Sequence, residues 1–182
     1  HGTSRRQRQM CIRDRLRAKA QLSQKLDCHV DDIYRLAIFG NHSPTMFPDL
    51  ENTLVVGKNA YQEINDHGWV ENEFLPKIQQ RGAEVIKARG ASSASSAARA
   101  ACDTVKAVEH PTRSGDVFNA AVMSDGAYGM PEGIFSGFPL ISDGKGSVEI
   151  VRDYSLSSFA KAGLKKTADE LVEERDLVKD LI

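Results

Sequence analysis

Apolar and polar positions follow two different periods along the chain, and these periods separate helical from extended segments. Residues 17–26 (RAKAQLSQKL) are rich in strong helix formers. Residues 34–39 (YRLAIF) form a short apolar run that ends at Gly40, which is typical of a buried strand. The start of the chain therefore predicts a helix, then a strand, then a turn where functional polar residues often lie.

The middle of the chain has the pattern of two long helices. Residues 71–89 carry apolar side chains at helical spacing and end at Gly90. Residues 92–108 are dominated by Ala and Ser, so we expect a second helix that packs closely in the centre of the fold. The stretch 49–70 predicts a polar loop or hairpin around Gly57.

After the second helix the period changes from helical to extended. Residues 117–124, 134–141 and 147–151 predict three strands separated by glycine-bearing turns, and residues 157–181 predict a closing helix. The expected order is helix, strand, two helices, three strands, helix. This order predicts an α+β domain with an antiparallel sheet and long helices, and not a regular βαβ repeat.

The first fifteen residues differ from the rest of the chain. They contain five arginines and one acidic residue, without apolar periodicity. A basic arm for nucleic acid or membrane is one interpretation. We instead interpret residues 1–15 as a non-native or disordered basic tail and residues 16–182 as the folded domain.

Composition narrows the class of protein further. The chain has 182 residues, 41% hydrophobic residues and a formal net charge of −1, which suits one globular core. This charge balance argues against a general nucleic-acid binder, and no apolar run is long enough to span a membrane. Three scattered cysteines fit neither a disulfide framework nor a zinc site, and they favour a reducing, cytoplasmic setting.

Three side chains near the start of the chain are candidates for chemistry. His42 lies in the turn after the buried strand, where a hydrogen-bonded structural histidine is the simpler interpretation. Asp14 and Arg17 are three residues apart on the expected helix face, a spacing usual for surface ion pairs. Such an acid can also hold the tautomer of a histidine, and such an arginine can grip a carboxylate with two hydrogen bonds. No histidine, cysteine or acidic cluster has metal-ligand spacing, so we expect no metal site.

Four segments carry a resemblance to a known family. They are RAKAQL (17–22), GNHS (40–43), QQRGAEVIKARGASSASSAA (79–98) and SDGAYGMPEGIFSGFPL (124–140). Together, and in this order, they resemble malate dehydrogenases of the cytosolic-type branch in its bacterial form, within the lactate/malate dehydrogenase superfamily. The similarity runs from about residue 17 to the final LVKDLI and covers only the C-terminal, catalytic half of such enzymes.

The resemblance implies roles for individual residues. The family's proton donor and acceptor falls on His42, and the arginine that grips a substrate carboxylate falls on Arg17. The aspartate that partners the histidine falls on Asp14, although the leucine that precedes it in the family is Arg13 here. Because Asp14 lies within the expected tail, its role depends on whether that segment is native. Ser92 falls where related enzymes place a small or hydroxyl residue near the substrate.

The implied reaction is the reversible, NAD-dependent oxidation of malate to oxaloacetate in the cytoplasm by a homodimer. The chain contains no G-x-G-x-x-G motif, so we expect the Rossmann domain to be missing and the chain alone to be inactive. Two alternatives remain open at this point. One is a stand-alone binding or scaffold module, and the other is a lactate-type 2-hydroxyacid dehydrogenase.

Overall fold

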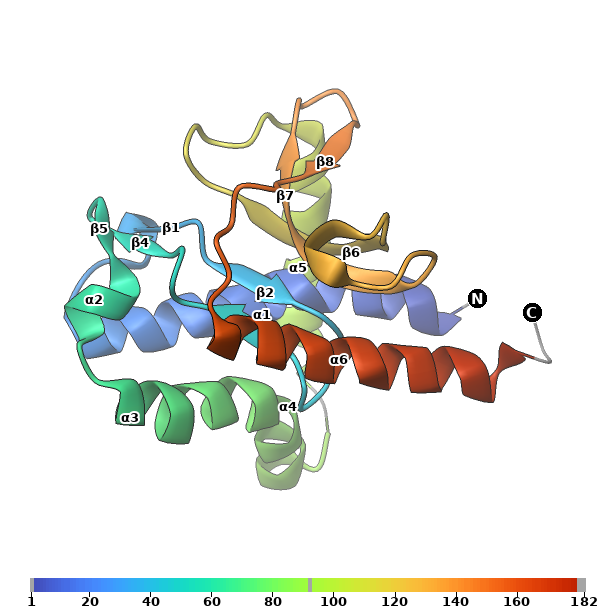
Figure 1. Ribbon diagram of the computed structural model, residues 1–182, viewed down its shortest axis with the longest axis horizontal. Helices are drawn as coiled ribbons and strands as arrows, with labels where there is room; N and C mark the ends of the chain where they lie inside the picture. The colour runs from blue at the N-terminus through green and yellow to red at the C-terminus, as the bar shows by residue number, and fades with distance from the viewer. Residues whose placement is uncertain (1, 92, 180–182) are drawn as a thin grey trace.

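The computed structural model describes residues 2–91 and 93–179, with side chains described from residue 10 onward. It confirms the predicted α+β class, since long helices pack against small antiparallel sheets (Figure 1). The α-helices are α1 (Gly2–Leu26), α2 (Ala60–Ile64), α3 (His67–Trp69), α4 (Leu75–Arg89), α5 (Ala94–Glu109) and α6 (Ser158–Leu177). The strands are β1 (Ile33–Tyr34), β2 (Ala37–Phe39), β3 (Phe47–Asp49), β4 (Leu54–Val55), β5 (Lys58–Asn59), β6 (Phe118–Met123), β7 (Phe135–Ser142) and β8 (Val148–Ile150). Short helical turns cover Val30–Asp32, Val70–Phe74 and Ala127–Gly129, and that of Val70–Phe74 is π-helical.

Helix α1 differs from the expectation at its start. It begins at Gly2 and includes nearly all of the segment expected to be a tail. Cys11, Arg15, Ala18 and Leu22 follow one another at intervals of four, three and four residues and are all buried. The boundary expected after residue 15 therefore falls inside a helix, while the native or non-native origin of residues 1–15 stays a prediction.

The strand predicted at residues 34–39 is two strands in the structure. Arg35, between β1 and β2, has a φ of 55°, in the left-handed region that interrupts an extended strand. Its backbone N–H donates to Asp116 at 2.8 Å, and its guanidinium donates to Asp153 at 2.7 Å. These contacts with distant parts of the chain stabilise a break that the local apolar pattern does not show.

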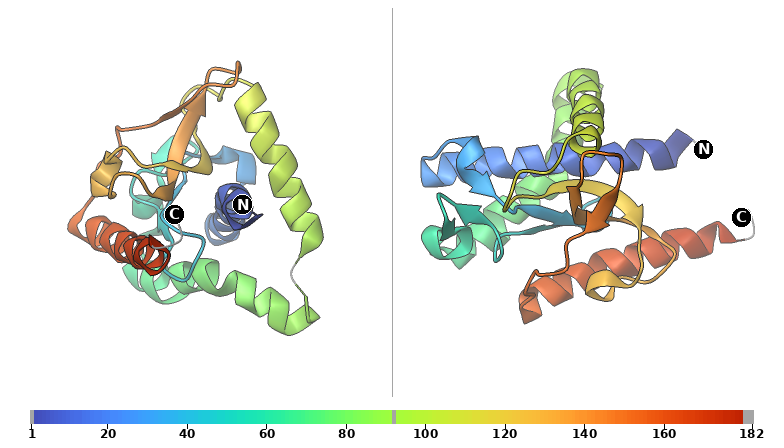
Figure 2. Two further views of the ribbon diagram at one scale, coloured as in Figure 1. Left: turned by 90° about the vertical axis from the view of Figure 1, so that its right-hand side faces the viewer. Right: turned by 90° about the horizontal axis from the view of Figure 1, so that it is seen from above.

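The two long helices predicted in the middle of the sequence form close to their expected positions. The segment α3, the π-helical turn and α4 run on as one helical stretch that ends at Gly90, whose φ of 70° is the left-handed helix cap that glycine favours. The expectation that the Ala/Ser-rich helix is central is wrong. Helix α5 lies on the outside of the molecule (Figure 2) and buries only Ala100 among its residues. Its small side chains pack against α1 and β7 along one side only.

The three strands predicted after residue 116 are confirmed as an antiparallel sheet in the order β6-β7-β8. A bridge between Gly40 and Gly137 joins the end of β2 to β7 through two backbone hydrogen bonds of 3.2 and 2.8 Å. A Cβ atom on Gly137 would lie 2.9 Å from the carbonyl oxygen of Gly40, so this close approach requires glycine. Asn119 also bridges the strands, donating to the carbonyl groups of Ile38 and Phe138.

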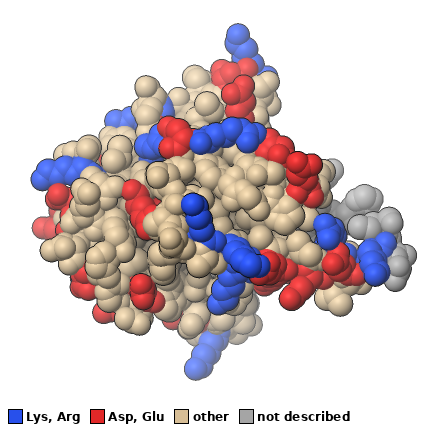
Figure 3. Space-filling view, in the orientation of Figure 1, with Lys and Arg blue, Asp and Glu red and all other residues tan. Residues whose placement is uncertain are grey.

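Two long helices enclose the β2–β3 pair, with α1 against β2 and α6 against β3 (Figures 1 and 2). Leu164, Ala168 and Leu171 lie in the buried stripe of α6, while residues 180 and 181 of the expected helix lie outside the described residues. The loop after β2 therefore runs between α1 and α6. On the face drawn in Figure 3, side chains of both charge signs are interspersed with uncharged surface. Within residues 2–91 and 93–179, no helix combines the length and apolar character needed to cross a membrane.

Candidate active site

His42 and Asp14 form the centre of the candidate site. His42 lies in the turn after β2, and Asp14 faces it from α1. The Nδ1 atom of His42 lies 2.5 Å from Oδ2 of Asp14, whose side chain is only 1% exposed. Because a carboxylate accepts, Nδ1 carries the hydrogen of this bond, and a neutral His42 keeps its free lone pair on Nε2.

Arg17 completes the group from the next turn of α1. Its Nη1 donates to Oδ1 of Asp14 at 3.1 Å, so both oxygens of the buried carboxylate have a partner. Burial lowers the pKa of Arg17, Asp14 opposes this effect, and the like charges of Arg13 and Arg81 add to it. The structure thus brings Asp14, Arg17 and His42 together, while their roles in a reaction stay predictions.

Arg13 also belongs to this group. In the sequence it stands out only because it replaces the leucine that precedes the aspartate in the family. Its Nη2 donates to Nε2 of His42 at 3.2 Å. Its Nε is buried and has no hydrogen-bond partner among the described residues. Both ring nitrogens of His42 are therefore engaged, Nδ1 by an acceptor and Nε2 by a cationic donor.

The backbone around His42 is held by α6. The His42 N–H donates to Oδ1 of Asn41, and Nδ2 of Asn41 donates to Glu174 at 2.9 Å. The N–H of Asn41 donates to Oγ1 of the fully buried Thr167 at 2.9 Å. Gly40 has a φ of 90°, and a Cβ there would lie 2.2 Å from that Oγ1. Only glycine therefore lets the loop approach α6 this closely.

The residues after His42 are bound to the same helix. The hydroxyl of Ser43 donates to Oε2 of Glu170 at 2.5 Å, and the hydroxyl of Thr45 meets the same oxygen. The sequence carries no local signal for this attachment, because Glu170 lies 127 residues beyond Ser43. Glu170 and Glu174 are one helical turn apart, which is the only pattern that marks them as members of one face.

Other parts of the structure bear on the remaining expectations. Ser92, expected near the substrate, lies outside the described residues.

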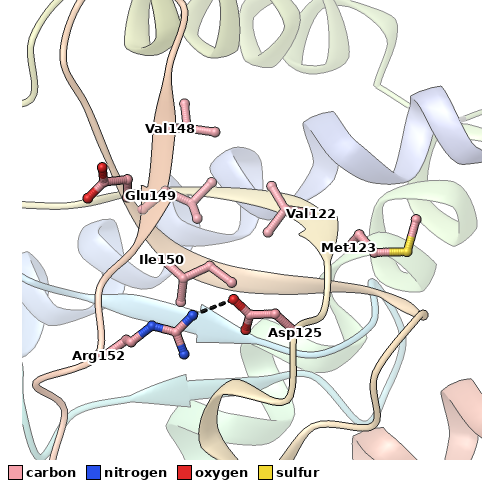
Figure 4. A pocket seen from close by; sticks show the side chains of 8 residues that line it. Val122, Met123, Asp125, Val148, Glu149, Ile150 and Arg152 are labelled. Carbon is pink, nitrogen blue, oxygen red and sulfur yellow. Dashed lines mark hydrogen bonds and ion pairs between the residues drawn. The ribbon is translucent and has the colours of Figure 1, made fainter.

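A separate hollow of about 440 Å³ lies on the β6-β7-β8 sheet, between Val122, Ile150 and the Arg152–Asp125 ion pair (Figure 4). Neither Asp14 nor His42 lines it. In the part of the chain that the structure describes, no three histidine, cysteine or acidic side chains converge to hold a metal ion.

Solved structures that are similar to this chain include dehydrogenases of the lactate/malate class. The malate dehydrogenase of Naegleria fowleri is 39% identical, with a TM-score of 0.86 over 93% of this chain and 52% of that one. A lactate dehydrogenase of Trichomonas vaginalis, in complex with NADH and oxamate, is 26% identical, with a TM-score of 0.86 over 93% of this chain and 53% of that one.

More specifically, the chain belongs to the family described as lactate/malate dehydrogenase, alpha/beta C-terminal domain, whose sequence model matches residues 13–182. Malate dehydrogenases of Magnetococcus marinus and Cutibacterium acnes are 47% and 44% identical over 169 residues each, or 93% and 92% of this chain. The chain spans about half the length of these curated relatives, 52% and 51%. These matches confirm the resemblance drawn from the four motifs.

Proposed function

We propose that this chain is the catalytic half of an NAD-dependent malate dehydrogenase, which oxidises (S)-malate reversibly to oxaloacetate. The observation that carries the proposal is the contact of His42, Asp14 and Arg17 within a domain of this family. The family match begins at residue 13 and therefore includes Asp14, which supports a native role for this residue.

His42 is the proposed general acid and base, acting at Nε2. In malate oxidation, the neutral imidazole takes the proton of the substrate hydroxyl at Nε2, while Nδ1–H stays bound to Asp14. The carboxylate of Asp14 stabilises the positive charge that the ring then carries. In the reverse direction, protonated His42 returns this proton to the oxygen of the oxaloacetate carbonyl.

Arg17 is the proposed carboxylate-binding residue. A guanidinium offers two parallel N–H groups, which match the two oxygens of a carboxylate and fix its orientation. Arg17 donates to Asp14 through Nη1, and its side chain is 18% exposed, so part of the guanidinium remains open to a ligand. Binding one carboxylate here orients the reacting carbon toward His42.

Arg13 has to release Nε2 before this chemistry can begin. The nitrogen that accepts the substrate proton is the one that Arg13 now contacts at 3.2 Å. A substrate carboxylate offers Arg13 a stronger, charged acceptor than a neutral ring nitrogen. We therefore expect substrate binding to draw the Arg13 side chain away from His42.

NAD binding is not assigned to any residue of this chain. Its sequence contains no G-x-G-x-x-G motif, and the described residues have no strand followed directly by a glycine turn and an α-helix. When bound, NAD would accept the hydride that malate loses. We propose that its site lies in the half of the relatives that this chain does not match, and that the chain alone has negligible activity.

Malate is favoured over lactate by the degree of similarity. The named malate dehydrogenases of Magnetococcus marinus, Cutibacterium acnes and Naegleria fowleri are 47%, 44% and 39% identical, and the lactate dehydrogenase of Trichomonas vaginalis is 26% identical. We further propose that the complete enzyme acts in the cytoplasm as a homodimer.

The test is a hybrid in which the N-terminal half of the Magnetococcus marinus enzyme precedes residue 13 of this chain. We expect the hybrid to oxidise NADH with oxaloacetate and to be far slower with pyruvate, followed by the absorbance of NADH. The 182-residue chain alone serves as the matched control and should show no turnover. A hybrid that prefers pyruvate, or turnover by the chain alone, would contradict the proposal.

A further inference from the structure

A cationic cleft lies between α1 and α4, next to the candidate active site. Its volume is about 410 Å³, and its lining includes Arg17, Gln21, Lys77 and Arg81. Among the described residues, no acidic side chain lines it. Arg17 is shared, since the same guanidinium that meets Asp14 also lines this cleft.

The sequence places these side chains on two facing helix surfaces. On α1, Arg17, Gln21 and Gln24 follow one another at intervals of four and three residues. On α4, Lys77 and Arg81 are four residues apart. Residues at these intervals share one face of a helix, so both helices present donor groups toward the same space.

The positive charge in the cleft is neutralised only in part. Arg17 pairs with the buried Asp14 at 3.1 Å. Arg81 pairs with Glu84 at 3.2 Å, but both side chains are about half exposed (51% and 50%), and such surface pairs contribute little. Lys77 is exposed, and no ion pair is found for it among the described residues. The charge of Arg81 reaches Arg17 closely enough to lower its pKa, in addition to the larger effect of burial.

We propose that this cleft binds a small oxyanion with two or more negative charges, held by Arg17 and Arg81 with Lys77 at its edge. The guanidinium groups match the paired oxygens of a carboxylate or a phosphate, and Gln21 and Gln24 can add amide donors. The anion regulates the candidate active site, because it engages the Arg17 guanidinium that the substrate carboxylate needs. This regulatory part rests on the proposed function, whereas binding of the anion does not.

Calorimetric titration of the 182-residue chain at low ionic strength tests the binding. The probes are tricarballylate, pyrophosphate and, as a single-charge reference, acetate. We expect one of the two polyvalent anions to bind at least about tenfold more tightly than acetate, and Arg81→Gln to weaken that binding about tenfold. The matched control is Arg89→Gln, which removes an exposed arginine of the same helix outside the cleft and should leave the affinity unchanged.

The pattern of results separates the ligand sources and the two proposals. Preference for tricarballylate identifies the ligand of the cleft as a polycarboxylate, and preference for pyrophosphate identifies it as a phosphate. Equal weakening by Arg81→Gln and Arg89→Gln, or no preference over acetate, overturns the site. His42→Asn should not alter the affinity, so the binding result stands even if the proposed reaction fails. In the hybrid enzyme, the bound anion should raise the KM for oxaloacetate several-fold without lowering kcat, and an unchanged KM overturns the regulatory part.

Discussion

Replacing Arg13 by leucine should expose the reactive nitrogen of His42. Nη2 of Arg13 donates to Nε2 of His42 at 3.2 Å, and this contact covers the lone pair that a proton or an electrophile needs. Leucine, the residue that the family pattern has at this position, offers no donor. The change also removes a buried Nε that has no partner among the described residues, so the cost in folding stability should be small.

The size of the effect follows from the strength of the lost hydrogen bond. A hydrogen bond with a charged group contributes about 1.5–3 kcal/mol when buried. The His42 side chain is 22% exposed, so we take the lower end of this range. At about 1.4 kcal/mol per factor of ten, Nε2 should be free about ten times more often in Arg13→Leu than in the wild type.

Acylation by diethylpyrocarbonate measures this fraction directly, because the reagent attacks an unprotonated imidazole nitrogen. Peptide mass spectrometry at one fixed pH should show His42 modified about tenfold faster in Arg13→Leu than in the wild type, because Nε2 is free about ten times more often. His29, whose side chain is 71% exposed, gives an internal reference rate. Arg99→Leu, which removes an exposed arginine paired with Asp103, is the matched control. Equal His42 rates in the two variants would refute the reasoning.

Three further predictions concern the fold around the site, and urea unfolding measures each of them. Gly40→Ala should lower the free energy of unfolding by about 2 kcal/mol or more, because Gly40 has a φ of 90° and a Cβ would lie 2.2 Å from Thr167 Oγ1. A loss below about 0.5 kcal/mol would contradict this close contact. Leu22→Ala should cost about 2–5 kcal/mol, since Leu22 is 0% exposed in the core between α1 and α4, and a loss typical of a surface residue would place it elsewhere. Burial raises the pKa of Asp49 from 3.8 to about 6, so its contribution to stability is full below 3.8 and is lost as the pH rises through about 6. Asp49→Asn should remove this pH-dependent contribution, which is about 3 kcal/mol at 1.36 kcal/mol per pKa unit. If the free energies of unfolding of wild type and variant change in parallel between pH 4 and 7, the prediction is wrong.

The order of the main elements could be predicted from the sequence, because periodicity is a local property. The start of α1 could not, since its buried stripe includes the charged residues Asp14 and Arg15. Each is buried because it has a distant partner, His42 for Asp14 and Asp116 for Arg15. Hydrophobic patterning counts such residues as exposed, and only tertiary contacts show that they lie inside.

The candidate site was partly accessible from the sequence. The three-residue spacing of Asp14 and Arg17 is a local signal, but their contact with His42 follows only from the family resemblance or from the structure. The attachment of the His42 loop to α6 joins residues 122 to 133 positions apart, and no local pattern encodes it. The same limit applies to the α1–α4 cleft, because no local pattern shows that these two helix faces lie against each other.

The central claim is that His42 transfers the substrate proton, and turnover of His42→Asn in the hybrid enzyme tests it most directly. Loss of a general acid–base group should lower kcat with oxaloacetate and NADH by at least about 100-fold, with a much smaller change in KM. His110→Asn, at an exposed histidine outside the site, should retain normal turnover. Near-normal kcat in His42→Asn would contradict the assignment of His42 and, with it, the proposed mechanism.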